Sequence, residues 1–170
     1  LYIIIIGAEL LISHRQQAKS YAARDTVNNF LLSILAGLTG LLMRGVSFLI
    51  LVFFFGHRLG HFSEEATRSV LYWVALVLLV DLMHYWLHRL GHLCRFFWAV
   101  HVNHHSSTHF NFSVGFRSGV LEPFYGFLFF IPLALLGFQP ADILFTYALC
   151  QVWAILTHTE KIKKMGKCGK

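Results

Sequence analysis

The chain has 170 residues, of which 56% are hydrophobic and 13% are charged, and its formal net charge is +6. Its mean hydropathy is +0.61. A water-soluble domain of this length cannot bury so much apolar surface, so the composition excludes an ordinary soluble enzyme and predicts an all-α bundle embedded in a membrane. The basic residues are spread between apolar segments rather than gathered on one polar face, which excludes a nucleic-acid partner.

The first part of the chain predicts membrane helices joined by polar loops. Residues 1–12 are apolar but too few to cross a bilayer, and we interpret them as the end of a truncated first helix. Residues 13–28 are polar and basic, which is typical of a loop on the cytoplasmic side, and Asp25 or Thr26 is the expected N-cap of the next helix. Residues 29–55 form one apolar stretch that is long enough for a single tilted span.

The second part predicts further helices and sets the topology. The apolar run of residues 69–83, continued as a helix through His92, carries histidines out of the bilayer and into the headgroup region. Residues 120–138 and 141–157 are apolar and joined by a short turn with glycine and proline, which predicts a helical hairpin. The result is an integral, multi-pass protein of about four spans besides the first helix. With the first loop inside, this count places the histidines and the lysine-rich tail on the cytoplasmic side.

Histidine is concentrated between residues 84 and 109. Residues three or four apart share one face of a helix, so most of these histidines form a stripe and a compact patch. The stripe is His84, His88 and His92, and the patch is His101, His104 and His105. Imidazole is the commonest metal ligand among side chains, and a nitrogen-rich set suits iron, copper or zinc. The two faces therefore predict a site for two metal ions, against the alternative of solvated histidines at the membrane surface.

The histidine spacing resembles that of a known family. The run YWLHRLGH (residues 85–92) followed by HVNHHSS (residues 101–107) resembles the first two histidine boxes, HxxxH and HxxHH, of the fatty acid hydroxylase and sterol desaturase superfamily of membrane di-iron oxygenases. The segment HTE (residues 158–160) resembles the stretch before the last box of that family. Within the superfamily, HHSSxxFNFS and the following Arg117 are most similar to the alkylglycerol monooxygenase branch.

The resemblance implies which residues bind metal. Six histidines would be ligands of two iron ions. His84 is a candidate seventh, although it lies one turn before the first box and so outside the family pattern. The six are His88, His92, His101, His104, His105 and His158. Asp81 and Glu160 are candidates to accept a hydrogen bond from a ligand ring and so to fix its orientation.

The resemblance also implies an activity and a division of the chain. The protein would be an O2-dependent oxidoreductase that hydroxylates or desaturates a membrane lipid of the fatty acyl, sterol or alkylglycerol type. Its electrons would come from a donor protein or another reductant, with a pterin as one candidate. Residues 1–80 would be N-terminal membrane helices and loops, and residues 81–170 a hydroxylase-like domain. The final HxxHH box of the family is expected after His158 but is missing before Lys170, so we expect this fragment alone to be inactive.

Two other metal-binding classes remain open. A bis-histidine haem protein would use single histidines on facing helices rather than clustered boxes. A metal-binding membrane protein without oxygenase activity, such as a transporter, would carry its ligands nearer the middle of the membrane. A zinc protease is excluded because it needs HExxH, whereas Arg89 follows His88 in this chain.

Overall fold

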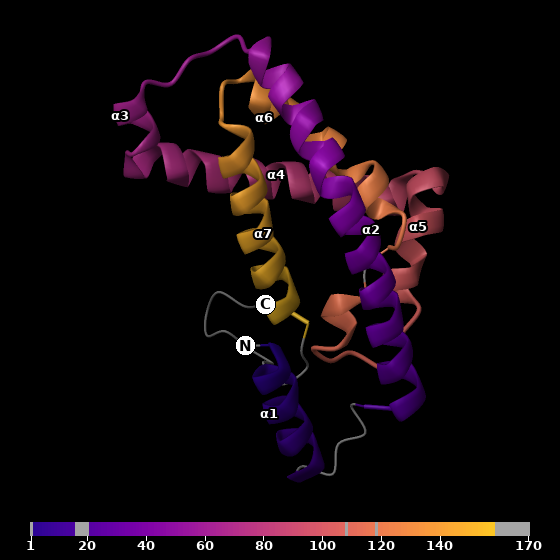
Figure 1. Cartoon of the computed structure of the whole chain (residues 1–170). Helices are drawn as coiled ribbons and strands as arrows, with labels where there is room; N and C mark the ends of the chain where they lie inside the picture. The colour runs from indigo at the N-terminus through magenta and orange to yellow at the C-terminus, as the bar shows by residue number, and fades with distance from the viewer. Residues whose placement is uncertain (1, 16–20, 108, 118, 159–170) are drawn as a thin grey trace.

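The structure is a computed structural model that describes residues 2–15, 21–107, 109–117 and 119–158 (Figure 1). Within these ranges every regular element is helical and there is no strand, which confirms the predicted all-α class. In chain order the elements are α1 (Tyr2–Arg15), α2 (Ala23–Gly56), α3 (Glu64–Thr67), α4 (Val70–Leu93), α5 (Arg95–His105), η1 (Val114–Phe116), η2 (Glu122–Phe124), η3 (Gly126–Phe130), α6 (Ile131–Leu135) and α7 (Pro140–Leu156).

Two helices, α2 and α4, have the length and composition of membrane spans. They have 34 and 24 residues, and no other helix in the described part of the chain meets both conditions. Only 11% of the apolar window of α2 is buried, and Leu42 on this helix is 76% exposed. The core helix of a soluble protein would be mostly buried, so this outward apolar surface suits contact with lipid. The apolar helices Gly126–Leu135 and Pro140–Leu156 are shorter, and the number of spans stays a prediction.

The start of α2 differs from the prediction. Its N-cap is Ala22, so the expectation that Asp25 or Thr26 would cap the helix is wrong. The carboxylate of Asp25 is engaged elsewhere, because it accepts hydrogen bonds from Ser107 Oγ at 2.5 Å and from Arg117 Nη1 at 3.2 Å. Asp25 therefore lies in the first turn, where a negative charge suits the helix dipole, and joins the helix to a distant loop.

The helix α4 continues without interruption through His92, as the sequence predicted. The hydroxyl of Ser69 accepts a hydrogen bond from the backbone N–H of Tyr72 at 3.2 Å and caps the start of this helix. After one extended residue α5 begins, and it packs against α4. Gly91 permits the close packing, because a Cβ at this position would lie 3.1 Å from Cγ of His101.

The first arm of the predicted hairpin, residues 120–138, is not one helix. It is divided into η2, η3 and α6. Pro123 and Pro132 lie in the first turns of η2 and α6, where a missing N–H is tolerated, whereas one α-helix running through both positions would lose a backbone hydrogen bond at each. The predicted turn is present: Gly137 has a left-handed φ of 100°, and α7 begins at Pro140.

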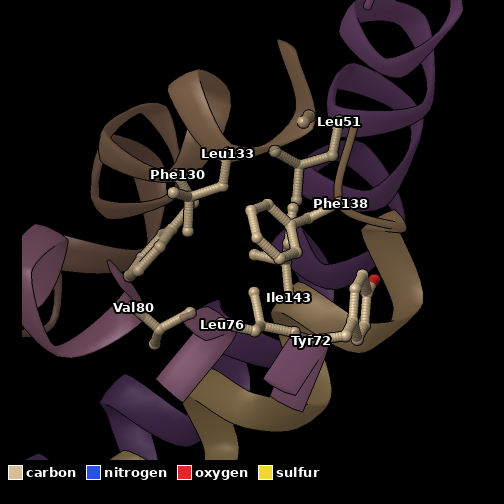
Figure 2. Close-up of a cluster of buried hydrophobic side chains, with 9 residues drawn as sticks. Leu51, Tyr72, Leu76, Val80, Phe130, Leu133, Phe138 and Ile143 are labelled. Carbon is tan, nitrogen blue, oxygen red and sulfur yellow. The ribbon is translucent and has the colours of Figure 1, made fainter. Parts of the chain in front are cut away.

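An apolar core forms where the C-terminal half of α2 and the N-terminal halves of α4 and α7 pack against η3, α6 and the turn that follows α6 (Figure 2). None of its side chains is more than 4% exposed. The core consists of Leu51, Tyr72, Leu76, Val80, Phe130, Leu133, Ala134, Phe138 and Ile143. His88 and His92 lie on the other half of α4, and His158 follows the end of α7. The core therefore holds the helices together at one end and leaves their other ends free to meet around the histidines.

Candidate metal centre

Four histidines on α4 and α5 direct their rings toward one another. We call His88, His92, His101 and His105 the four-histidine group. One ring nitrogen of each lies within 4.8 Å of those of the other three. The Nε2 atoms of His88 and His92 are 3.3 Å apart, and those of His101 and His105 are 3.2 Å apart. Each helix thus contributes two histidines one turn apart, and the packing of α5 on α4 brings the two pairs together.

The two shortest of these separations fit neighbouring ligands of a single metal ion. At a metal–nitrogen distance of about 2.1 Å, neighbouring nitrogens around a tetrahedral or octahedral ion lie about 3.0–3.4 Å apart and opposite ones about 4.2 Å. The closest nitrogens in the four-histidine group, at 3.2 and 3.3 Å, match the neighbouring distance. Uncharged imidazole nitrogens suit iron, copper or zinc, whereas calcium and magnesium prefer oxygen ligands.

A second pair of histidines lies beside this group. The Nε2 atoms of His104 and His158 are 3.1 Å apart. The Nδ1 of His104 lies 2.8 Å from the carbonyl oxygen of Arg117, and the Nδ1 of His158 lies 2.7 Å from that of Ala154. A carbonyl oxygen only accepts hydrogen bonds, so each Nδ1 carries a proton and each Nε2 of the neutral ring presents a lone pair. Because two facing lone pairs repel each other, this arrangement favours a cation between them.

Burial keeps the histidines of α5 uncharged. It lowers the pKa of His101 to about 3 and the pKa of His104 to about 4, and neighbouring histidines add to both effects. For His104 the hydrogen bond to the carbonyl of Arg117 acts in the opposite direction. The pKa of His105 is also lowered, mainly by burial. Near neutral pH these rings are therefore in the uncharged form that binds metal.

The other predicted site residues lie outside the two histidine groups. His84 lies one turn before His88, and its ring centroid is 6.0 Å from that of Tyr147. Asp81 is exposed, and none of the described residues forms a hydrogen bond with its carboxylate. Glu160 lies outside the described residues. A ligand role for His84, and hydrogen bonds from ligand rings to Asp81 or Glu160, stay predictions.

Arg117 joins the helices around the site. Its side chain is 9% exposed and donates hydrogen bonds from all three nitrogens. Nε donates to the carbonyl oxygen of Asn103 at 2.6 Å, and Nη2 to Ser106 Oγ at 2.5 Å. Nη1 donates to Asn29 Oδ1 at 2.8 Å and to Asp25 Oδ1 at 3.2 Å. The carboxylate of Asp25 compensates the buried charge, so the N-terminal end of α2 is fixed to the C-terminal end of α5.

The same residue positions a histidine. The backbone carbonyl of Arg117 accepts the hydrogen bond from Nδ1 of His104, so a shift of Arg117 would reorient that ring. In the sequence, Arg117 is noted only as part of the similarity to the alkylglycerol monooxygenase branch, and its role in positioning His104 was not predicted. One signal was present: Asp25 and Asn29 are one turn apart, on one face at the start of an apolar helix, and such a pair needs a polar or cationic partner.

A cavity of about 1690 Å³ lies beside both histidine groups. Its walls come mainly from α2, α4, α5, α7 and the 3-10 helices. They include five histidines of the two groups described above, His88, His101, His104, His105 and His158. Away from the histidines the wall is largely apolar, with Phe48, Phe127, Phe130, Leu144 and Phe145. Pockets for small molecules usually measure about 300–1,000 Å³. The size and the apolar wall suit a long hydrocarbon ligand.

Comparison with known proteins identifies the family. The family model described as fatty acid hydroxylase matches residues 73–169, which is more than half of the chain. The chain belongs to the fatty acid hydroxylase family, and this confirms the resemblance drawn from the two histidine boxes. No solved structure matches the chain.

Several similar proteins are named alkylglycerol monooxygenase. The one from Danio rerio is 33% identical over 148 residues, which are 82% of this chain and 32% of that protein. The one from Homo sapiens is 37% identical over 98 residues, 55% of this chain and 21% of that protein. The one from Caenorhabditis elegans is 28% identical over 97 residues, 57% of this chain and 19% of that protein. The similarity confirms the predicted branch, and the chain spans about a third or less of these three relatives.

Proposed function

We propose that the complete protein is a metal-dependent lipid oxygenase of the alkylglycerol monooxygenase type. The observation that carries this proposal is the convergence of the four-histidine group and the His104–His158 pair beside one large apolar cavity. Family membership and the names of the relatives support the same activity. An alkylglycerol, or another lipid with a fatty acyl or sterol body, would enter the cavity from the bilayer and be hydroxylated or desaturated there.

The chain supplies ligands for two iron ions in this proposal. The four-histidine group would hold one ion, and His104 with His158 would contribute to holding the second. Iron bound there would supply the O2-dependent cleavage of a C–H bond, with electrons from a donor protein or from a reductant such as a pterin. The carbonyls of Arg117 and Ala154 fix the Nδ1–H tautomers of His104 and His158, so both lone pairs already face the metal position.

The rest of the chain would bind the lipid and hold the site in the membrane. The apolar part of the cavity would orient the hydrocarbon chain and exclude water from the reaction. We propose that α2 and α4 cross the membrane in a multi-pass arrangement with the histidines on the cytoplasmic side. We also propose that residues 1–80 provide membrane helices and residues 81–170 a hydroxylase-like domain, since both histidine groups lie in the second range.

The clustering of the nitrogens argues against a bis-histidine haem protein. Haem takes its two axial ligands from opposite faces and needs open space for the porphyrin between the helices. The four-histidine group instead has four ring nitrogens within 4.8 Å of one another. A metal-binding membrane protein without oxygenase activity would use the same ligands but would have no use for the large cavity.

The proposal is tested with the complete, iron-loaded protein, a reductant and 18O2. An alkylglycerol, a fatty acyl lipid and a sterol are each supplied, and products are analysed by mass spectrometry. We expect 18O or a new double bond in one lipid class, and loss of this product in His88→Gln. The matched control His57→Gln changes an exposed histidine at the end of α2 and should leave the product yield unchanged. Unchanged lipids with fully loaded protein, or a haem absorption band in the purified protein, would overturn the proposal.

A further inference from the structure

The cavity wall contains a set of hydrogen-bonding side chains between the histidines and the apolar end. They are His84 of α4, Glu122 of η2, and Tyr147 and Gln151 of α7. In the described part of the chain, the side chains of these four residues form no hydrogen bond with another residue. Polar groups in an apolar wall that lack protein partners are satisfied by water or by a ligand.

Packing between the elements brings these side chains close together. The ring centroids of His84 and Tyr147 are 6.0 Å apart. The carboxyl group of Glu122 lies near enough to the Tyr147 phenol to interact with it electrostatically. A Cβ added to Gly126 would lie 3.7 Å from Cγ of Glu122 and 3.6 Å from Cδ2 of Leu87, so Glu122 lies beside α4. Three separate elements therefore direct polar groups into one part of the cavity.

This polar set lies near the four-histidine group and the His104–His158 pair but includes none of their members. His84 precedes His88 by one turn, about 6 Å along α4 at a rise of about 1.5 Å per residue. Gln151 comes before His158 in the chain, and at the same rise the two residues are separated by about 10 Å along the direction of α7. On the other side of Tyr147, the wall of α7 continues with Leu144 and is apolar. A lipid that reacts at the histidines can therefore place a polar group among these side chains.

The chemistry of the set indicates what it binds. A carboxylate accepts hydrogen bonds, a phenol donates and accepts, and an amide does both. Such a mixture matches hydroxyl groups, which also donate and accept. An ammonium group would need acceptors alone, and a phosphate would need donors and cations, of which Arg44 is the one charged example in the same wall.

Resting on the lipid oxygenase function proposed above, we propose that Glu122, Tyr147 and Gln151 bind the hydroxyl groups of the substrate headgroup. The apolar part of the cavity then holds the hydrocarbon chain, and the carbon that reacts lies within a few bonds of the headgroup. These residues determine specificity and do not take part in the oxidation itself.

The test compares two lipids of equal chain length with the complete protein. One is a 1-O-alkylglycerol, and the other is a dialkyl ether without hydroxyl groups. Tyr147→Phe removes one hydroxyl and keeps the ring that packs 4.7 Å from the ring of Phe130. Gln151→Leu removes the amide. For each variant we expect KM for the alkylglycerol to rise about three- to tenfold, with kcat and the values for the ether unchanged.

The control variant is Tyr85→Phe, which makes the same chemical change on the outer face of α4, where Tyr85 is 49% exposed. It should leave both lipids unaffected. Equal loss for the alkylglycerol and the ether, or an unchanged KM for the alkylglycerol in both cavity variants, would overturn the proposal.

Binding separates this proposal from the oxygenase function. Equilibrium binding of a radiolabelled alkylglycerol and of the labelled ether is measured without a reductant, so no turnover occurs. If the protein oxidises neither lipid, the hydroxyl-binding set still predicts tighter binding of the alkylglycerol and about three- to tenfold weaker binding in Tyr147→Phe. Equal binding by wild type and Tyr147→Phe would overturn the headgroup proposal even if oxidation is observed.

Discussion

The two ends of the helix bundle are held together by different kinds of contact. At one end α2, α4 and α7 pack through Leu51, Leu76 and Ile143, each of which is 0% exposed. At the other end polar contacts join the elements, such as the 2.8 Å hydrogen bond from Arg117 to Asn29 and the 3.1 Å approach of His104 and His158. Apolar packing is non-directional, whereas ligand nitrogens need fixed tautomers and separations. Stability should therefore depend mainly on the first end, and metal binding on the second.

The largest expected effect is loss of metal binding when a ligand is removed. His105→Gln in the complete protein should reduce lipid oxidation by more than the ~10- to 100-fold typical of a residue that only orients a ligand. Iron per chain, measured by elemental analysis, should fall with it, while the thermal midpoint of the metal-free protein stays close to that of wild type. A metal-free variant that unfolds as readily as a core mutant would contradict the separation of the two ends.

The opposite pattern is expected in the apolar core. Leu76→Ala should lower the free energy of unfolding by about 2–5 kcal/mol, because it leaves a cavity among fully buried side chains. Iron per folded chain should not change. Leu78→Ala is the matched control on the same helix, since Leu78 is 65% exposed and its truncation opens no cavity. Equal destabilisation by the two variants, measured by denaturant unfolding in detergent, would show that the core does not hold this end of the bundle.

Arg117→Lys tests the polar network between the helices. The charge remains, but lysine cannot reproduce the planar set of donors that contacts Asn103, Asn29 and Ser106. We expect activity to fall ~10- to 100-fold through misorientation of His104, together with a changed iron spectrum. Arg89→Lys is the control, because Arg89 is an exposed residue of α4. An unaltered iron spectrum in Arg117→Lys would mean that this residue acts on stability alone.

A smaller effect is expected at the contact between α4 and α5. In Gly91→Ala the new methyl group would lie 3.1 Å from Cγ of His101, so the ring must shift by a few tenths of an ångström. We expect a loss of stability of about 1–3 kcal/mol and weaker iron binding. Gly45→Ala adds the same methyl group within α2 where nothing lies within 4 Å, so it should not lower stability and should leave iron binding unchanged. Iron affinity that is unchanged in Gly91→Ala would show that His101 adapts freely.

The features that could be predicted from the sequence are those encoded locally. The i, i+4 spacing of His88 and His92 within one helix, the family boxes and the turn at Gly137 each depend on neighbouring residues, and the structure has them as expected. Pro123 and Pro132 also indicate that residues 120–138 are not one helix. The prediction gave more weight to the high apolar content of this segment and so missed the division.

The features that could not be predicted from the sequence depend on packing between distant segments. Asp25 looked like a helix cap because its partner, Arg117, lies far along the chain. The pairing of His104 with His158 likewise requires α7 to return beside α5, which no local pattern specifies. Hydrogen-bond networks of this kind have no sequence periodicity, whereas helices and boxes do.

The most direct test of the account is to locate iron in crystals of the complete protein by anomalous diffraction. We predict two peaks, one among the Nε2 atoms of the four-histidine group and one at the Nε2 atoms of His104 and His158. Peaks elsewhere, or a single peak that leaves either set of nitrogens without metal, would contradict the claim that these helices converge to bind two ions.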